Sequence, residues 1–317
     1  MMGDVVVFCR INKIEFYSIE LEEMIGEIAL EKQSKVTYLE ESVVLLSPDK
    51  IARYNVRGEC LETVLYSSTY DSIDAVGNGF MLSTVWESEV SFWSIDPIQE
   101  ITSAILDEMA SPTVVVQHED VFYFGAGFFV YSWMPETGQT QILNVDVLMV
   151  SGIIVHDQKL YISSHMIGDY SPSPLAVYDL VENKGYELEE SDDGLCSLHQ
   201  DTLFVWNDAG YKNDQWIKGS DWAGVLQENG QVKTIWTDEG GSSEIFWQDI
   251  FCLGDFYALQ GKNREFYLLH KDNNEVVVKN LEGWNGISAS EEHFWLWNDA
   301  EIVLHTSDSL LSMLLEQ

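Results

Sequence analysis

Hydrophobic and polar residues alternate with a period of two along nearly the whole chain, and helical periodicity is almost absent. The apolar runs are short, and most are bounded by Gly, Asn, Asp or Ser, the residues that favour turns. The pattern therefore predicts many short antiparallel strands joined by hairpins, and an all-β protein.

One hairpin recurs: an apolar strand with a central aromatic residue, an acidic or Gly-containing turn, then a second strand. Copies lie at 13–31, 50–66, 89–105, 128–143 and 175–190, with weaker copies at 223–238 and 264–280. A second kind of hairpin, with a polar turn and an apolar second strand, lies at 114–125, 152–163, 196–206 and 287–297. The two alternate along the chain, which predicts a repeating unit of four strands in about 40 residues.

Two stretches of the chain are nearly identical. Residues 206–209 and 297–300 both read Trp-Asn-Asp-Ala, and 297 − 206 = 91 residues separate them. This separation equals two repeats of about 45 residues each. The stretches are therefore interpreted as the same strand, two repeats apart.

Many four-stranded repeats in a chain of this length are typical of a β-propeller, in which apolar sheets bury their faces against one another. The whole chain resembles the broad WD40-like and quinoprotein-like group of propellers. It has neither the Gly-His…Trp-Asp pair of each WD40 repeat nor the Gly-Gly signature of kelch repeats. The resemblance thus implies a single propeller domain over 1–317, with seven or eight blades (eight by strand count), and no functional residues.

Closure of the propeller is expected to involve both ends of the chain. Residues 4–10 (DVVVFCR) resemble the second strand of a blade. Residues 309–317 (SLLSMLLEQ) could supply the missing innermost strand, so that N- and C-terminal strands share one blade. The alternative for 309–317 is a short helix, because Leu, Met and Glu favour helices.

The charge is far from balanced, with 16 Lys and Arg against 53 Asp and Glu and a formal net charge of −37. Such a field repels nucleic acids and anionic membranes and attracts basic proteins or divalent cations. The alternative is that acidity only maintains solubility. We expect a basic protein partner, no nucleic acid, no membrane and a monomer when the protein is alone.

The four cysteines do not form a C-x-x-C pair and are interpreted as free thiols. The chain lacks both a secretory leader pattern and a run of 18 apolar residues. These observations predict a cytoplasmic protein.

Two enlarged connections, 163–174 and 207–222, interrupt successive repeats between the second and third strands. Together with the acidic loops 189–194 and 237–244 they are expected to converge on one face. Aromatic residues on exposed loops are typical interface anchors, and acids around them steer a partner. The alternative is that the Trp residues fold back over their own loop. The predicted partner-binding residues are His165, Met166, Asp169, Tyr170, Asp192, Asp193, Asp208, Tyr211, Asp214, Trp216, Asp221, Trp222, Asp238 and Glu239.

His118, His156 and His199 each end the innermost strand of a repeat, beside acidic residues. Imidazoles with carboxylates could hold Zn²⁺ or another divalent ion at the mouth of the central channel. The alternative is that they are polar turn residues of a repeated hairpin.

The sequence contains no G-x-S-x-G, H-E-x-x-H or P-loop motif, so no catalytic residue and no cofactor other than a divalent metal is predicted. The pattern favours a non-enzymatic propeller that captures a basic protein, as an inhibitor, an immunity-type protein that neutralises a toxin, or a scaffold subunit. Two alternatives stay open. One is a metal-assisted hydrolase or lyase at the channel mouth, and the other is a carbohydrate or small-ligand binder.

Overall fold

The computed structural model describes residues 5–18, 20–21, 23–31, 33–39, 41–66, 70–84, 88–106, 112–165, 174–188, 194–207, 210–212, 215–217, 222–237, 247–261, 264–290, 293–298 and 302–316. The chain forms two compact units, Met1–Leu143 and Asn144–Gln317. The single domain expected over 1–317 stays a prediction.

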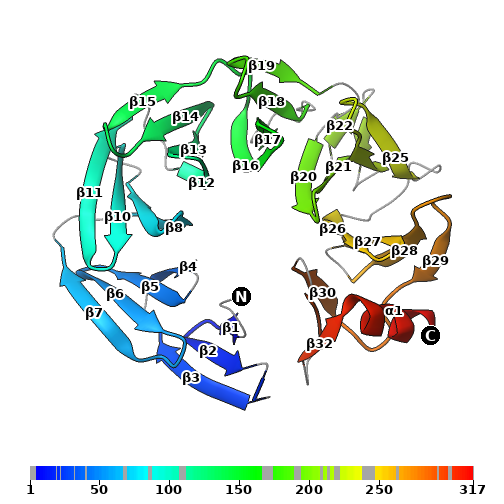
Figure 1. Ribbon diagram of the computed structural model, residues 1–317, viewed down its shortest axis with the longest axis horizontal. Helices are drawn as coiled ribbons and strands as arrows, with labels where there is room; N and C mark the ends of the chain where they lie inside the picture. The colour runs from blue at the N-terminus through cyan, green and yellow to red at the C-terminus, as the bar shows by residue number, and fades with distance from the viewer. Residues whose placement is uncertain are drawn as a thin grey trace. The chain divides into compact units, whose positions relative to one another are not determined.

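The first unit holds four antiparallel sheets, in which the strands follow one another in chain order (Figure 1). The first sheet has three described strands, and the other three sheets have four strands each. The strands are β1 (Val5–Cys9), β2 (Lys13–Ser18), β3 (Glu23–Ala29), β4 (Lys35–Leu39), β5 (Ser42–Ser47), β6 (Lys50–Asn55), β7 (Cys60–Leu65), β8 (Ser72–Val76), β9 (Gly79–Ser83), β10 (Glu89–Ile95), β11 (Ile98–Ile105), β12 (Pro112–His118), β13 (Val121–Ala126), β14 (Phe129–Met134) and β15 (Gln139–Ile142).

The second unit also holds four such sheets, with an extra two-stranded hairpin, β22–β23, and one helix, α1. The hairpin lies in the chain between the second and third strands of the second sheet, so the third strand of that sheet is β24. The elements are β16 (Met149–His156), β17 (Lys159–His165), β18 (Ala176–Asp179), β19 (Lys184–Glu187), β20 (Gly194–His199), β21 (Thr202–Asn207), β22 (Gly210–Lys212), β23 (Gln215–Ile217), β24 (Trp222–Leu226), β25 (Val232–Thr237), β26 (Trp247–Leu253), β27 (Phe256–Gly261), β28 (Phe266–His270), β29 (Val276–Lys279), β30 (Gly286–Ala289), β31 (His293–Trp297), β32 (Ile302–Thr306) and α1 (Ser307–Leu315).

The described residues thus form eight sheets of three or four strands, and the predicted all-β, four-strand repeat is confirmed. Of the two predicted blade numbers, eight is the one observed. The two Trp-Asn-Asp-Ala stretches begin at equivalent places, since Trp206 lies in β21 and Trp297 in β31, the second strand of each sheet.

Burial is highest in the second strand of a sheet and low in the outer strand, as β4 to β7 show. Every residue of β5 and β9 is buried, whereas the outer strand β7 alternates between exposed and half-buried side chains. Strands covered on both faces are apolar throughout. For this reason the second strands of the repeats appear in the sequence as the continuous apolar runs.

The first hairpin of a sheet closes in two residues where the sequence has polar pairs. Asp157 and Gln158 both have positive φ, as do Gln200 and Asp201. Two consecutive positive φ angles define the type I′ turn, whose twist matches that of the flanking strands. The polar residues after His156 and His199 are therefore turn residues of a repeated hairpin.

The chain ends differ from one another. β1 pairs with β2 and corresponds to a second strand, as predicted. The expectation that residues 309–317 form an innermost strand is wrong, because Ser307–Leu315 is helix α1. The Thr306 side chain accepts a hydrogen bond from the Ser309 N–H and caps this helix. Leu310 and Leu314 are buried on the core of the last two sheets, so an amphipathic helix covers this core.

Candidate functional site

Both predicted insertions lie at the connection from the second to the third strand, in successive sheets of the second unit. One follows β17 and precedes β18, and the other follows β21 and precedes β24. The second insertion contains the hairpin β22–β23, in which Tyr211 pairs with Trp216 across the backbone register. This pairing fixes the backbone register of residues 210–212 against 215–217.

The predicted partner-binding residues fall into two groups. His165, which ends β17, and Trp222, which begins β24, are in regular strands, as are Tyr211 and Trp216. The others lie outside the described residues: Met166, Asp169, Tyr170, Asp192, Asp193, Asp208, Asp214, Asp221, Asp238 and Glu239. Their convergence on one face stays a prediction.

Trp222 is half-buried and packs against the apolar core between the sheets of β16–β19 and β20–β25. Its backbone N–H donates to the Asn207 side-chain oxygen at 3.1 Å. Asn207 is itself buried, at 4% exposure. These contacts connect Asn207 and Trp222, the two ends of the insertion 207–222.

His199 is a buried junction of three successive sheets. Its Nδ1 accepts a hydrogen bond from the Cys252 N–H at 3.2 Å, so the proton of the neutral ring is on Nε2. Nε2 lies 3.0 Å from the Ser290 carbonyl oxygen and donates to it. The ring also lies beside Phe251 and Phe294. Both ring nitrogens are therefore engaged within the protein.

A polar pair missed by the sequence analysis lies beside this histidine. The Ser197 hydroxyl donates to the Ile250 carbonyl at 3.0 Å and connects β20 with β26. Burial raises the pKa of Asp249, against hydrogen bonds from Ile250 and Ser197. The only sign of Asp249 in the sequence was a polar residue within an innermost strand. This sign does not single out one acid among the 53 of the chain.

The other two predicted metal ligands have ordinary surroundings. His118 ends β12 and is partly buried, and His156 ends β16 with its Nε2 3.3 Å from an Asp157 carboxylate oxygen. The His156 ring lies near Tyr161. Across the described ranges, no group of three or more His, Cys, Asp or Glu is arranged to hold a metal ion.

The acidic residues that the structure describes are exposed or half-buried. None of the Asp and Glu residues that the structure describes is buried. Basic residues are unevenly distributed: positions 58–158 contain no Lys or Arg, although they span the third and fourth sheets of the first unit. That span contains 15 of the 53 acids and so carries a charge of −15.

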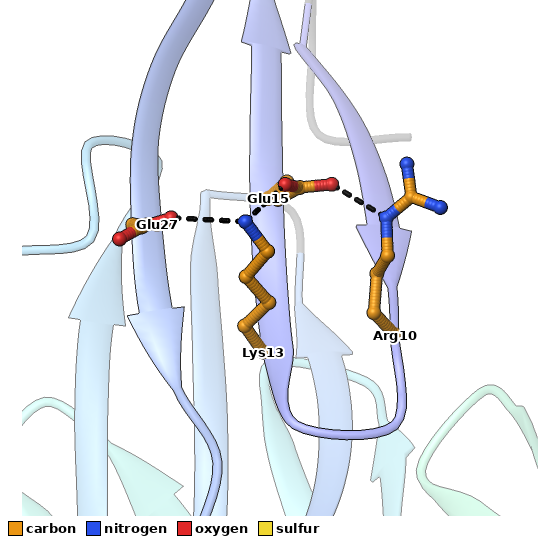
Figure 2. A network of polar contacts seen from close by, with 4 residues as sticks. All are labelled: Arg10, Lys13, Glu15 and Glu27. Atoms are coloured by element: carbon orange, nitrogen blue, oxygen red, sulfur yellow. Dashed lines mark hydrogen bonds and ion pairs between the residues drawn. The ribbon is translucent and has the colours of Figure 1, made fainter. Parts of the chain in front are cut away.

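The basic residues of the first two sheets are largely engaged with acids nearby. Figure 2 shows Lys13 between Glu15 and Glu27, and Arg10 on Glu15 at 2.7 Å. The hydrogen bonds of Lys13 and Arg10 lower the pKa of Glu15, and those to Glu15 and Glu27 raise the pKa of Lys13. Lys50 contacts Glu31 at 2.7 Å in the same way. These cations are locally compensated and do not offset the acids of 58–158.

The chain resembles several solved structures over almost its whole length. One is the computationally designed Ika8 protein, with a TM-score of 0.66, 10% identity, and coverage of 96% of this chain and 93% of that one. BamB from Moraxella catarrhalis has a TM-score of 0.63 and 13% identity, with coverage of 95% of this chain and 93% of that one. The dihydro-heme d1 dehydrogenase NirN, solved in complex with DHE, has a TM-score of 0.63 and 13% identity, with coverage of 96% of this chain and 71% of that one.

These neighbours are β-propellers, and the fold of this chain is a β-propeller. At such low identity the likeness concerns the fold alone. The sequence matches no protein-family model and no curated protein. Over the described ranges, no helix is both long and apolar enough to cross a membrane.

Proposed function

We propose that this chain is a non-enzymatic binding protein, whose acidic propeller captures a basic protein partner as an inhibitor, an immunity-type protein or a scaffold subunit. The observation that carries the proposal is the net charge of −37, together with the finding that no described Asp or Glu is buried. Charges at the surface attract an approaching partner, whereas buried charges would be neutralised by partners within the protein.

The propeller framework supports this role because packed sheets hold the strands that the loops connect. The insertion 207–222 rises from the junction of Asn207 and Trp222 and contains its own hairpin. Loops held by a rigid scaffold lose little conformational entropy when they bind. The partner is therefore expected at the insertions 163–174 and 207–222, and the cytoplasmic location stays a prediction.

The test immobilises the protein, identifies the basic proteins that it retains at low salt, and titrates the purified partner against two charge variants. The first variant removes loop acids: Asp192→Asn, Asp193→Asn, Asp208→Asn and Asp214→Asn. The matched control removes the same charge from exposed acids elsewhere: Glu136→Gln, Asp146→Asn, Glu228→Gln and Glu282→Gln.

We expect the loop variant to weaken binding by more than about tenfold and the control by less than about threefold. Equal losses would show that net charge alone acts and that the loops are no interface. Failure to find a saturable basic partner at low salt would remove the proposal.

A further inference from the structure

The outer strand β11 is an unusually open edge. It spans Ile98–Ile105, eight residues, against four to seven for the other outer strands of the sheets. In the described part of the chain β11 pairs with β10 alone. Three outer strands of the second unit contain a lysine, namely Lys184, Lys233 and Lys279, whereas β11 has none, like β3, β7 and β15 of its own unit. Edge lysines are a common protection against strand pairing.

The register shows which backbone groups of β11 face this edge. The Leu106 N–H donates to the Ser88 carbonyl at 2.8 Å, next to the pair of Glu89 and Ile105. Hydrogen-bonded pairs alternate along antiparallel strands, so the main-chain groups of Ser103 and Ile105 point away from β10. A bulge at Phe92/Trp93 precedes this segment, and residues 102–105 beyond it are regular.

Two of the exposed side chains of β11 are aliphatic. Ile105 is 77% exposed and Ile101 is 52% exposed. Strand β7 repeats the pattern 40 residues earlier, with Leu65 at 77% and Leu61 at 48%. The two strands differ in charge, because Ile105 lies opposite Glu89 whereas Leu65 lies opposite Lys50.

The surroundings of β11 are acidic. The acids are Glu62 on β7, Glu89 on β10, Asp96 in the turn before β11, and Glu100 on β11 itself. Glu62 accepts the Ile98 N–H at 3.1 Å. The one cation nearby among the described residues is Arg53, whose guanidinium donates to the Ile95 carbonyl and lies 3.9 Å from Asp96. The edge therefore has net negative charge.

We propose that β11 accepts an extended, basic segment of a partner protein as an added strand. Main-chain hydrogen bonds to Ser103 and Ile105 supply the affinity, and alternating side chains supply the selectivity. Aliphatic partner residues cover Ile101 and Ile105, and Lys or Arg residues reach Glu89 and Glu100. The proposal rests on the proposed function for the basic character of the partner. A second copy of this chain is disfavoured as occupant because two chains of −37 repel each other.

The test measures the fluorescence anisotropy of a labelled peptide of about eight residues, alternating Lys and Val, with the protein at low salt. A second peptide of the same sequence is N-methylated at alternate positions, which keeps the charge and removes the donors on one edge. Ser103→Pro removes an outward N–H and leaves the pairing with β10 intact. Thr63→Pro is the matched control at the equivalent position of β7. Glu89→Lys tests the charge, and thermal melting checks that each variant folds.

We expect saturable binding of the unmodified peptide, weakened about tenfold or more by Ser103→Pro and by Glu89→Lys and within about twofold of wild type for Thr63→Pro. The proposal is overturned by equal binding of the methylated peptide, by equal effects of the two Pro variants, by no saturable binding, or by a wild-type dimer that Ser103→Pro abolishes. The loop-acid variant of the previous test should bind the peptide normally. Loss of partner capture in that variant therefore reports on the proposed function alone.

Discussion

The imidazole Nε2 of His199 lies 3.0 Å from the carbonyl oxygen of Ser290, a residue 91 positions further along the chain. The two residues occupy equivalent places, since His199 is the last residue of the inner strand β20 and Ser290 directly follows the inner strand β30. Between them β26 contributes the Cys252 N–H to the other ring nitrogen. One side chain thus joins three sheets of the second unit.

Replacing His199 should therefore destabilise the second unit. His199→Phe keeps the ring packing but leaves the Cys252 N–H and the Ser290 carbonyl without these partners. We expect a loss of about 2–4 kcal/mol in the free energy of unfolding, measured in urea. His156→Phe is the matched control at the equivalent turn of the preceding repeat. It should cost less than about 1 kcal/mol, because the Asp157 partner is 82% exposed. Equal losses would contradict the junction.

Asp74 should make stability depend on pH. Burial raises the pKa of Asp74 above its usual 3.8, against a hydrogen bond from Ser72. The folded protein thus holds this proton to higher pH than the unfolded chain, and the stabilisation by the proton is lost as pH rises through the folded-state pKa. Asp74→Asn removes the half-buried charge, so the melting temperature should rise at pH 7. The gain should vanish below about pH 3.8. Asp146→Asn, at an exposed acid, should show no such trend.

Helix α1 should contribute to stability through two leucines. Leu314 is 1% exposed and packs on the core of the last two sheets, whereas its neighbour Leu315 is 53% exposed. Leu314→Ala should lower the free energy of unfolding by about 2–5 kcal/mol because it leaves a cavity. Leu315→Ala should change it by less than about 0.5 kcal/mol. If denaturant unfolding gave similar values for both, the helix would not be docked as described.

Cysteine alkylation provides an independent test of burial. Cys9 and Cys60 are exposed and Cys252 is buried. Cys196 retains some exposed surface, but burial of its thiol raises the pKa to about 11 and keeps it protonated at pH 8. Iodoacetamide under native conditions should modify Cys9 and Cys60 within minutes and leave the other two until urea is added. Mass spectrometry of timed samples would show the order, and early labelling of Cys252 would contradict it.

The repeat was predictable because period-two alternation and turn residues act locally. Asp157 and Gln158 adopt the positive φ values of a hairpin turn whatever lies outside the hairpin. The end of the chain was harder. Ser307–Leu315 is a helix whose apolar side covers the core of the last two sheets. The residues near it in the sequence do not reveal this core.

The candidate site was predictable only in its position. Spacing alone placed the insertions 163–174 and 207–222 at the same connection of successive repeats. It did not show that Trp222 packs into the core between two sheets, nor that Ser103 and Ile105 direct their main chain away from β10. The packing of Trp222 depends on contacts with residues far away in the chain, such as Tyr161 and Leu175, whereas the outward direction of Ser103 and Ile105 depends on the register between β10 and β11.

The repeated Trp-Asn-Asp-Ala stretches show which properties follow from the sequence and which follow from the tertiary structure. Alternation and periodicity by themselves determined that Trp206 and Trp297 occupy the same strand of two sheets. The tertiary structure decided their environments: Trp206 is 4% exposed and donates its indole N–H to the Trp247 carbonyl of the next sheet, at 3.1 Å. Trp297 is 37% exposed and lies against Gly286 of its own sheet. The strand pattern is a property of consecutive residues, whereas burial depends on which sheet packs against it.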